Sequence, residues 1–337
     1  MIFRHWLVTM ALAVGCSHPT PGQATDAGPG ADAPLDGPDV AARQAAADQT
    51  AASAAECAAI GDFYWEIGDA SGRLGSGARG TTYGATTAVS IASSSKIVFG
   101  AYMIESKAGA LTDVQKAALR MLSGYAGLDP LLCSKAATVQ ACLDAGTPGP
   151  NYRYAAAEVG KFHYNGAHDQ WYVATSTAQG GEGMAALSAA QLTSTVLTTL
   201  KISPGFAYAS PLPSGGIRST PEQFAVFLRA IVSGQLRLHD YLGADAVCTL
   251  PGPDCPAAVS SPSPYAWHYS YNHWVEDDPT GDGAFSSAGA FGFYPWVSKD
   301  KTLYGLLSRQ STAGAGGFDS VNCGKKLRAA WITARPQ

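Results

Sequence analysis

Charged residues are scarce in this 337-residue sequence, where they make up 14% of the chain and leave a formal net charge of −4. No cluster of lysine and arginine is present, although such a cluster is the electrostatic feature of proteins that bind nucleic acids. The sequence also contains no Cys-x-x-Cys pair, a common element of zinc sites. We therefore expect no nucleic-acid partner, no metal and no cofactor.

The apolar run at the N-terminus, from Trp6 to Val14, is too short to span a bilayer. With Arg4 before it and Gly15-Cys16 after it, residues 1–16 have the pattern of a bacterial export signal. Ala13-Val14-Gly15-Cys16 resembles a lipobox, although leucine is commonest where Ala13 stands. We expect an exported lipoprotein on the periplasmic face of the envelope or the cell surface, in contact with the membrane only through a lipid on Cys16. Plain secretion after cleavage elsewhere is the alternative, with the same compartment.

Residues 17–50 have almost no bulky side chains, because they consist mostly of alanine, proline, glycine and aspartate. Such a segment cannot offset the entropy lost on ordering, so we predict a solvated tether. The remaining residues, 51–337, are enough for one large core, or for a core with an inserted subdomain, and we expect a single catalytic unit.

The seven cysteines become six if Cys16 is lipidated, and an even number in an exported chain indicates three disulfides. Cys133 and Cys142 are close in sequence, and so are Cys248 and Cys255. Cys57 and Cys323 would then join the two ends of the domain. Six cysteines can pair in many ways, so this pairing is a plausible one and not a deduced one.

Strand patterns occur near both ends of this domain. Aromatic and branched residues predict strands at 63–68 and 73–77 around a turn, and further strands at 267–274, 289–297 and 302–308 that form an antiparallel meander. The middle of the chain is mainly helical. We therefore expect an α+β fold, in which an antiparallel sheet built from both chain ends is flanked by helices and carries a mainly helical inserted region.

Helix signals are clearest where a Ser or Thr is followed three residues later by Gln, which is a capping box. The pairs are Thr112 with Gln115, Ser188 with Gln191, and Thr220 with Gln223. Further helices are predicted from the alanine-rich segment 46–60, from Ser93 to Gly109, and at 320–332.

Ser93 and Lys96 are the candidate catalytic pair. Three residues are nearly one helical turn, so their side chains meet on one face of a helix that begins at Ser93. A serine hydroxyl needs a neighbouring base near neutral pH. Burial beside Ile97, Val98 and Phe99 and the positive helix end both favour the uncharged amine of Lys96. Ser-x-x-Lys alone is common by chance, and a capping serine with a solvent-facing lysine is the alternative.

Three further segments occur in a family that carries Ser-x-x-Lys. Ser214–Thr220 is similar to a Gly-Gly-Leu-x-Ser-Thr segment, Phe162–Gly166 to a tyrosine-containing second motif, and Ser287–Phe293 to the strand with the third motif. Over roughly residues 57–335 the chain resembles the penicillin-recognising serine hydrolases, namely serine β-lactamases, D,D-peptidases and related esterases, in their class C-like branch.

The resemblance implies a role for each matched residue. Ser93 would be the acylated nucleophile, Lys96 its base and Tyr164 a second proton carrier. The backbone amides of Ser93 and Ala290 would form the oxyanion hole. For Tyr164, a core aromatic ring with a satisfied hydroxyl is the alternative.

Two positions depart from the family pattern. Gly166 stands where an asparagine is usual; Asn165 or His168 could replace its amide, or the amide contact could be lost. Ser287, two residues before Gly289, stands where a lysine or histidine is usual, and a cation there holds a substrate carboxylate. Arg309 on the neighbouring strand could supply that charge. The substrate-binding candidates are therefore Asn165, His168, Ser287, Gly289 and Arg309.

These observations favour a serine hydrolase that forms an acyl-enzyme at Ser93 with a small ester or amide. A β-lactamase or D,D-peptidase, acting on β-lactams or D-alanyl peptides, is one alternative. A sensor that binds β-lactam or peptidoglycan without turnover is the other, because the two departures could have removed activity.

Overall fold

A computed structural model describes residues 39–312 and 316–337. The predicted export signal, Cys16 and the tether up to residue 38 lie outside these residues. Among the described residues, no helix is both long enough and apolar enough to cross a membrane.

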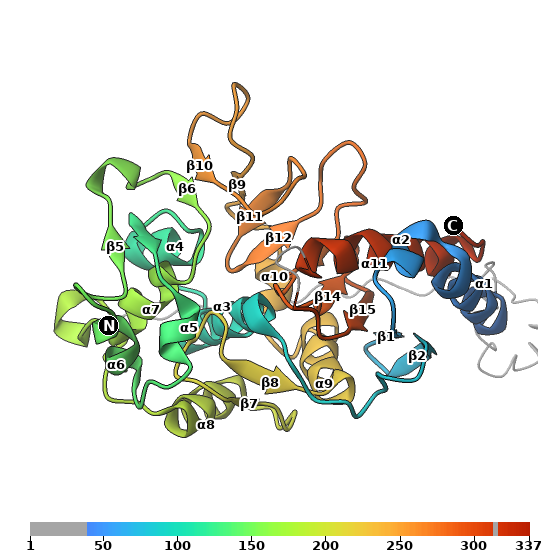
Figure 1. The fold of residues 1–337 in the computed structure, drawn as a ribbon, viewed down its shortest axis with the longest axis horizontal. Coiled ribbons are helices and arrows are strands. Elements are labelled where there is room, and N and C mark those ends of the chain that lie inside the picture. The colour runs from blue at the N-terminus through green and yellow to red at the C-terminus, as the bar shows by residue number, and fades with distance from the viewer. Residues whose placement is uncertain (1–38, 313–315) are drawn as a thin grey trace, which may run out of the picture. The chain divides into compact units, whose positions relative to one another are not determined.

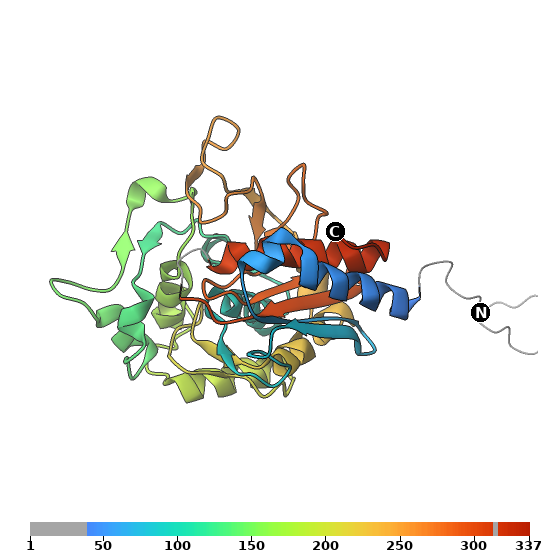
Figure 2. The ribbon, with the colours of Figure 1, turned by 45° about the vertical axis from the view of Figure 1, so that its right-hand side comes forward.

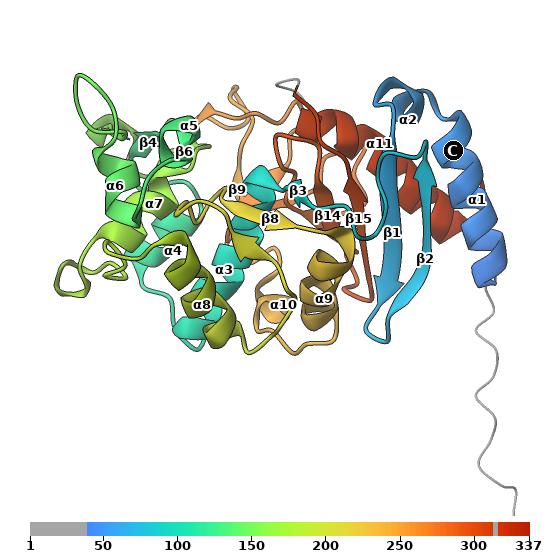
Figure 3. The ribbon, with the colours of Figure 1, turned by 60° about the horizontal axis from the view of Figure 1, so that its bottom comes forward.

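The core of the fold is an eight-stranded antiparallel sheet with the strand order β2-β1-β15-β14-β13-β12-β11-β9 (Figure 1). Its strands are β1 (Phe63–Asp69), β2 (Arg73–Arg79), β9 (Val247–Cys248), β11 (His268–Ser270), β12 (His273–Val275), β13 (Phe285–Ser286), β14 (Tyr294–Val297) and β15 (Leu303–Ser308). β1 pairs with β15 from the other end of the chain, with Glu66 opposite Leu306 (Figure 3). The predicted sheet from both chain ends is confirmed.

Helices cover both faces of this sheet. They are α1 (Val40–Ser53), α2 (Ala55–Ala59), α3 (Ser95–Ser106), α4 (Asp113–Leu119), α5 (Pro130–Cys133), α6 (Val139–Asp144), α7 (Ala167–Ala174), α8 (Ala189–Leu200), α9 (Pro221–Val232), α10 (Leu238–Tyr241) and α11 (Gly316–Thr333). Phe63, Trp65 and Ile67 of β1 pack with α1, α2 and α11. Tyr64 points to the other face, toward α9, and belongs to the core cluster that also contains residues of α3 and α8. Because side chains alternate along a strand, β1 is buried on both sides.

The inserted region carries the remaining short strands. β3 (Val89–Ser90), β8 (Ile217–Ser219) and β7 (Ala207–Tyr208) form one small sheet, β10 (Ala258–Ser260) pairs with β6 (Phe162–His163), and β4 (Tyr125–Gly127) pairs with β5 (Arg153–Tyr154). Single 3₁₀ turns lie at Ala92–Ser94, Ala156–Glu158 and Thr177–Gln179. All three predicted capping boxes are present, at the starts of α4, α8 and α9.

The helix α1 corrects the predicted tether, because residues 40–50 are helical and not solvated coil. Asp39 caps the helix by accepting a hydrogen bond from the amide of Ala42 at 2.7 Å. Ala47 and Ala51 are buried against the sheet and α11, and α1 lies beside α11 in Figure 2. Because alanine side chains are small, α1 and α11 can approach closely, and the alanine-rich segment becomes part of the core.

Two predicted strands are also corrected. Residues 267–274 form a hairpin, in which β11 and β12 are joined at Asn272, whose φ is +59°. Residues 289–293 form a turn before β14, with the amide of Gly292 donating to the carbonyl of Gly289 at 2.9 Å. The third motif therefore lies on the connection between β13 and β14. The predicted last helix begins earlier than expected, at Gly316.

Disulfides join Cys57 to Cys323, Cys133 to Cys142 and Cys248 to Cys255, which is the pairing that sequence proximity suggested. The first of these ties α2 to α11, and the other two close short loops.

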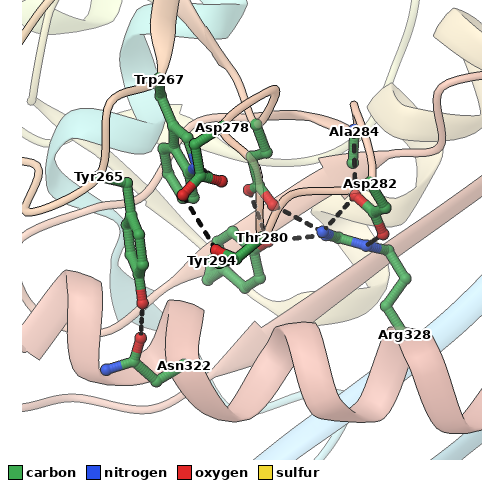
Figure 4. A network of polar contacts seen from close by, with 10 residues as sticks. Tyr265, Trp267, Asp278, Thr280, Asp282, Ala284, Tyr294, Asn322 and Arg328 are labelled. Atoms are coloured by element: carbon green, nitrogen blue, oxygen red, sulfur yellow. Dashed lines mark hydrogen bonds and ion pairs between the residues drawn. The ribbon is translucent and has the colours of Figure 1, made fainter.

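A buried arginine fixes α11 to the sheet (Figure 4). The guanidinium of Arg328 contacts Glu276 at 2.6 Å and Asp282 at 2.7 Å, and donates to the Tyr294 hydroxyl at 2.8 Å. A buried charge is costly unless it is paired, so Asp282 stabilises the fold by pairing with the Arg328 guanidinium. Within residues 39–312 and 316–337, no cluster of three or more histidine, cysteine or acidic residues could hold a metal ion.

Candidate active site

Ser93 lies in the 3₁₀ turn Ala92–Ser94, immediately before α3. Ala92 has a φ of +45°, which L-residues rarely adopt, so the turn must be held by its surroundings. The Ser94 hydroxyl donates to the carbonyl of Ser287 at 2.6 Å, and the Ser287 hydroxyl donates to the carbonyl of Ser93 at 3.1 Å. The first and third motifs therefore fix each other.

Ser95 attaches the same turn to the segment similar to Gly-Gly-Leu-x-Ser-Thr. Its hydroxyl donates to the carbonyl of Ala92 at 2.7 Å and accepts from the amide of Ile217 at 3.1 Å. Contacts from two directions thus hold the strained residue before Ser93.

Lys96 is buried, with 3% of its surface exposed. Its Nζ donates to the Oγ of Ser93 at 3.0 Å and to the carbonyl of Ser214 at 3.1 Å. The same nitrogen lies 4.8 Å from the centre of the Tyr164 ring. The structure therefore brings together Ser93, Lys96 and Tyr164, and the alternative of a solvent-facing lysine is wrong.

A cavity of about 80 Å³ opens beside Ser93. Its lining consists of Ser93, Tyr164, Pro262, Trp274, Ala288, Ala290, Gly317 and Phe318. None of these side chains is charged, and most are apolar. The cavity suits a small neutral group next to the Ser93 hydroxyl.

Tyr164 is held by aromatic neighbours. Its ring stacks on Trp274 at 5.2 Å between centroids and meets the edge of Tyr269 at 5.7 Å. These contacts position the ring between Lys96 and the cavity. Tyr164 is half-buried and lines the cavity, and no residue in the described part of the chain hydrogen-bonds its hydroxyl.

Gly166, at the position of the usual asparagine, leaves no room for a side chain. A Cβ built on Gly166 would lie 2.4 Å from the Oγ of Ser214. The Asn165 side chain is used locally, since its Oδ1 accepts from the amide of Ala167 at 2.6 Å and its Nδ2 donates to the carbonyl of His163 at 3.1 Å. Asn165 therefore closes a local turn just before α7, whose N-cap is Gly166, and Ser214 fills the space beside Gly166.

His168 is fully buried next to this turn. Its Nδ1 pairs with the Ser123 hydroxyl at 2.7 Å and its Nε2 with the carbonyl of His163 at 2.8 Å. Burial lowers the pKa of His168 to about 4, so the ring is neutral near pH 7. These two hydrogen bonds occupy both ring nitrogens, and His168 does not line the cavity.

The third motif supplies backbone to the site. A Cβ on Gly289 would lie 2.0 Å from the carbonyl oxygen of Ile91, so only glycine fits against the turn that contains Ser93. Ser93 and the exposed residue Ala290 both line the cavity. Among residues 39–312 and 316–337, no backbone carbonyl accepts a hydrogen bond from the amide of Ser93 or of Ala290.

Arg309 is engaged away from the cavity. Its Nε donates to the Ser320 hydroxyl at 2.8 Å, and its other nitrogens donate to the carbonyls of Gly316 at 3.0 Å and Ile60 at 3.4 Å. Burial lowers the pKa of this guanidinium. Arg309 therefore anchors the start of α11 and does not line the cavity.

Asp169 and Asn272 are the polar residues of this region that sequence reasoning missed. Both are fully buried, and the Asn272 Nδ2 donates to the Asp169 Oδ1 at 3.1 Å. Burial raises the pKa of Asp169 to about 7, while the positive charge of Lys96 and the hydrogen bond from Asn272 act in the opposite direction. The one signal in the sequence was an acidic residue one helical turn after Gly166.

No family model and no curated protein matches the sequence. Solved structures do match. A D-amino acid amidase from Ochrobactrum anthropi has a TM-score of 0.56 at 12% identity, over 86% of this chain and 98% of its own. A D-stereospecific amidohydrolase from Streptomyces sp. has a TM-score of 0.55 at 14% identity, over 88% and 99%. A β-lactamase from Mycobacterium bovis has a TM-score of 0.54 at 14% identity, over 81% and 96%. The chain therefore has the fold of the penicillin-recognising serine hydrolases that its motifs resemble.

Proposed function

We propose that the protein is a serine hydrolase that forms an acyl-enzyme at Ser93. The observation that carries this proposal is the 3.0 Å hydrogen bond from Lys96 Nζ to Ser93 Oγ, which lies within the range expected between a nucleophile and its base. Ser93 lines a small cavity on a fold whose solved examples include amidases and a β-lactamase.

The acylation step uses Lys96 as the proton acceptor. The Ser93 Oγ forms a bond to the substrate carbonyl carbon while its proton passes to the neutral Lys96 Nζ. The bond from that carbon to the leaving oxygen or nitrogen then breaks, and the leaving atom takes the proton, with the Tyr164 hydroxyl as relay. Water reverses the sequence: its proton passes to Lys96, its oxygen bonds to the carbonyl carbon, and Ser93 leaves with the proton restored.

The amides of Ser93 and Ala290 would stabilise the negative oxygen of the intermediate. Both residues line the cavity, and no backbone carbonyl of the described chain accepts from either amide. A donor of this kind contributes ~3 kcal/mol to the stability of the transition state for acyl transfer.

A small neutral ester or amide suits this cavity best. The volume of about 80 Å³ is small, and no lysine, arginine or histidine lines it. At the family's position for a cation, the Ser287 hydroxyl instead holds the carbonyl of Ser93. A penicillin or D-alanyl peptide would find no partner for its carboxylate in the lining.

We also propose that the protein is exported and anchored to the membrane through a lipid on Cys16 alone. The three disulfides support export, because disulfides persist in oxidising compartments. Labelled fatty acid should be incorporated into the wild-type protein and not into Cys16→Ser expressed in the same bacterium, whereas equal labelling of both would contradict lipidation.

One experiment separates the proposed activity from its alternatives. The purified protein is incubated separately with a nitrophenyl ester, a nitroanilide, a chromogenic cephalosporin and a D-alanyl peptide, and the acylated residue is located by mass spectrometry. Ester or anilide turnover with transient acylation of Ser93, abolished in Ser93→Ala and kept in Ser90→Ala, supports the proposal. Turnover of the cephalosporin or peptide alone indicates the family's other substrates, and stoichiometric acylation without turnover indicates a sensor.

A further inference from the structure

A second pocket lies in the inserted region, away from Ser93. Its volume of about 480 Å³ is typical of a site for a small molecule. Its polar and aromatic lining consists of Gln140, Tyr152, Trp171, Thr175, Ser176 and Gln179. None of the residues that line this pocket also lines the cavity beside Ser93. Tyr164 precedes α7 and residues 175–179 follow it, so the two sites lie toward opposite ends of a helix ~12 Å long.

The walls of this pocket are held in place by buried hydrogen bonds. α6 packs beside α7 (Figure 3), and the Gln170 Nε2 of α7 donates to the carbonyl of Val139 in α6 at 2.9 Å. Asn151, which precedes Tyr152, is buried, and its Nδ2 donates to the carbonyl of Cys142 in α6 at 3.2 Å. A pocket whose walls are already ordered loses little conformational entropy when a ligand binds.

Two aromatic side chains of the lining have unused hydrogen-bonding groups. The Trp171 ring stacks on Tyr125, with 4.0 Å between centroids and 16° between planes, and Tyr125 itself lies outside the lining. Tyr125 therefore fixes the indole from one side, while Trp171 and Tyr152 remain half-exposed at the pocket. Within residues 39–312 and 316–337, no group hydrogen-bonds the Trp171 indole nitrogen or the Tyr152 hydroxyl.

The amides and hydroxyls of the lining supply both donors and acceptors. The Ser176 hydroxyl donates to the Gln179 Oε1 at 2.9 Å, which leaves the Gln179 Nε2 as a donor. The Gln140 Nε2 donates to the Asp144 carboxylate at 2.8 Å, which leaves the Gln140 Oε1 as an acceptor. The Thr175 hydroxyl donates to a backbone carbonyl at 2.9 Å and can still accept. All side chains of the lining are uncharged.

We propose that this pocket binds a neutral saccharide. A pyranose ring has an apolar face of C–H groups that packs on an aromatic ring, and the hydroxyls at its edge both donate and accept hydrogen bonds. Trp171 and Tyr152 match the apolar face, and the amides and hydroxyls of the lining match the edge. A charged ligand would find no counter-charge in the lining. The proposal does not depend on the reaction at Ser93, because the two sites share no residue.

The test follows the indole of Trp171 directly. The full-length protein with ¹⁵N-labelled tryptophan is titrated separately with cellotriose, maltotriose and triacetylchitotriose, which distinguish plain hexose polymers from an N-acetylated one. The indole signal that is absent from Trp171→Phe is assigned to Trp171, and it should shift with at least one trisaccharide.

Calorimetry with the trisaccharide that binds then measures the contribution of each side chain. Trp171→Ala should weaken the affinity by about tenfold or more, because the ring platform is lost. Gln179→Ala should weaken it by roughly threefold, because one hydrogen bond is lost. The matched control is Tyr154→Ala, since Tyr154 is an exposed aromatic residue of β5 that also packs on Tyr125 but does not line the pocket. This control should bind like wild type.

The outcomes separate this site from the proposed active site. No shift of the Trp171 signal with any of the three trisaccharides overturns the proposal. Binding that is lost in Ser93→Ala also overturns it, because the saccharide would then occupy the cavity beside Ser93. Binding by a wild-type protein that hydrolyses none of the test substrates supports the pocket and contradicts the hydrolase. If Trp171→Ala does not fold, Gln179→Ala decides, since Gln179 is exposed, and an unchanged affinity in that variant overturns the proposal.

Discussion

Replacing Asp169 by asparagine should change stability in a pH-dependent way. The free energy of unfolding of Asp169→Asn minus that of wild type should be larger at alkaline pH than at acidic pH. Asn has nearly the same shape as a protonated carboxyl, so packing should change little. The two proteins then differ mainly in one titrating proton. Since Asp169 is fully buried, that proton is strongly coupled to folding.

The sign of the effect follows from the direction of the shift. Burial raises the pKa of Asp169 from an ordinary value of 3.8 to about 7 in the folded protein. Between these values the folded chain keeps the proton and the unfolded chain has lost it, so stability falls as the pH rises. A shift of about three units at roughly 1.36 kcal/mol per unit sets an upper value of ~4 kcal/mol. His168 and His273, whose pKa values burial lowers to about 4, give the opposite slope, but both proteins contain them.

Urea unfolding of both proteins across about pH 4 to pH 8.5 at constant ionic strength measures this difference. The free energy of unfolding of Asp169→Asn minus that of wild type should rise by several kcal/mol across the range and level off above about pH 7. Asp144→Asn should show no comparable trend, because that carboxylate is exposed. A difference that does not change with pH would refute the reasoning, since Asp169 would then titrate alike in both states.

Four further substitutions test the site. Lys96→Arg should abolish acylation of Ser93 and leave the unfolding midpoint nearly unchanged, because a guanidinium does not deprotonate; an acylated variant by mass spectrometry would remove Lys96 from the mechanism. Tyr164→Phe should slow turnover by about two to four powers of ten with little loss of stability, whereas full activity with a loss of about 1 kcal/mol would indicate a structural hydroxyl. Gly166→Ala should lower the free energy of unfolding by about 1–3 kcal/mol, because the added Cβ would clash with Ser214. Combining it with Ser214→Ala should restore most of that stability. If the two single effects simply add in urea unfolding, the contact with Ser214 is contradicted.

Local patterns in the sequence were sufficient for the parts of the fold that local physics decides. The three capping boxes satisfy helix ends within four residues of chain, so they can be found without tertiary contacts. The pairing of Cys57 with Cys323 was a plausible one once the other four cysteines were matched by proximity, and the strand patterns predicted a sheet built from both chain ends, in which β1 pairs with β15. Ser93 and Lys96 meet because three residues make nearly one helical turn.

Features that depend on distant residues were missed. Residues 40–50 look like a tether because alanine buries little area, yet Ala47 and Ala51 pack where α11, from the other end of the chain, comes close. Residues 267–274 look like one strand, but the hairpin at Asn272 is fixed by its approach to Gly100 on α3. Asp169 could not be paired with Asn272 from sequence, because 103 positions separate them.

The two departures from the family motifs act together once they are placed in space. At Gly166 the missing amide is replaced by Ser214, whose carbonyl accepts from Lys96, so Lys96 keeps a neutral oxygen partner. At Ser287 the missing cation is not replaced, because Arg309 is engaged with the start of α11. The absence of a cation at this position therefore supports the proposed neutral ester or amide substrate.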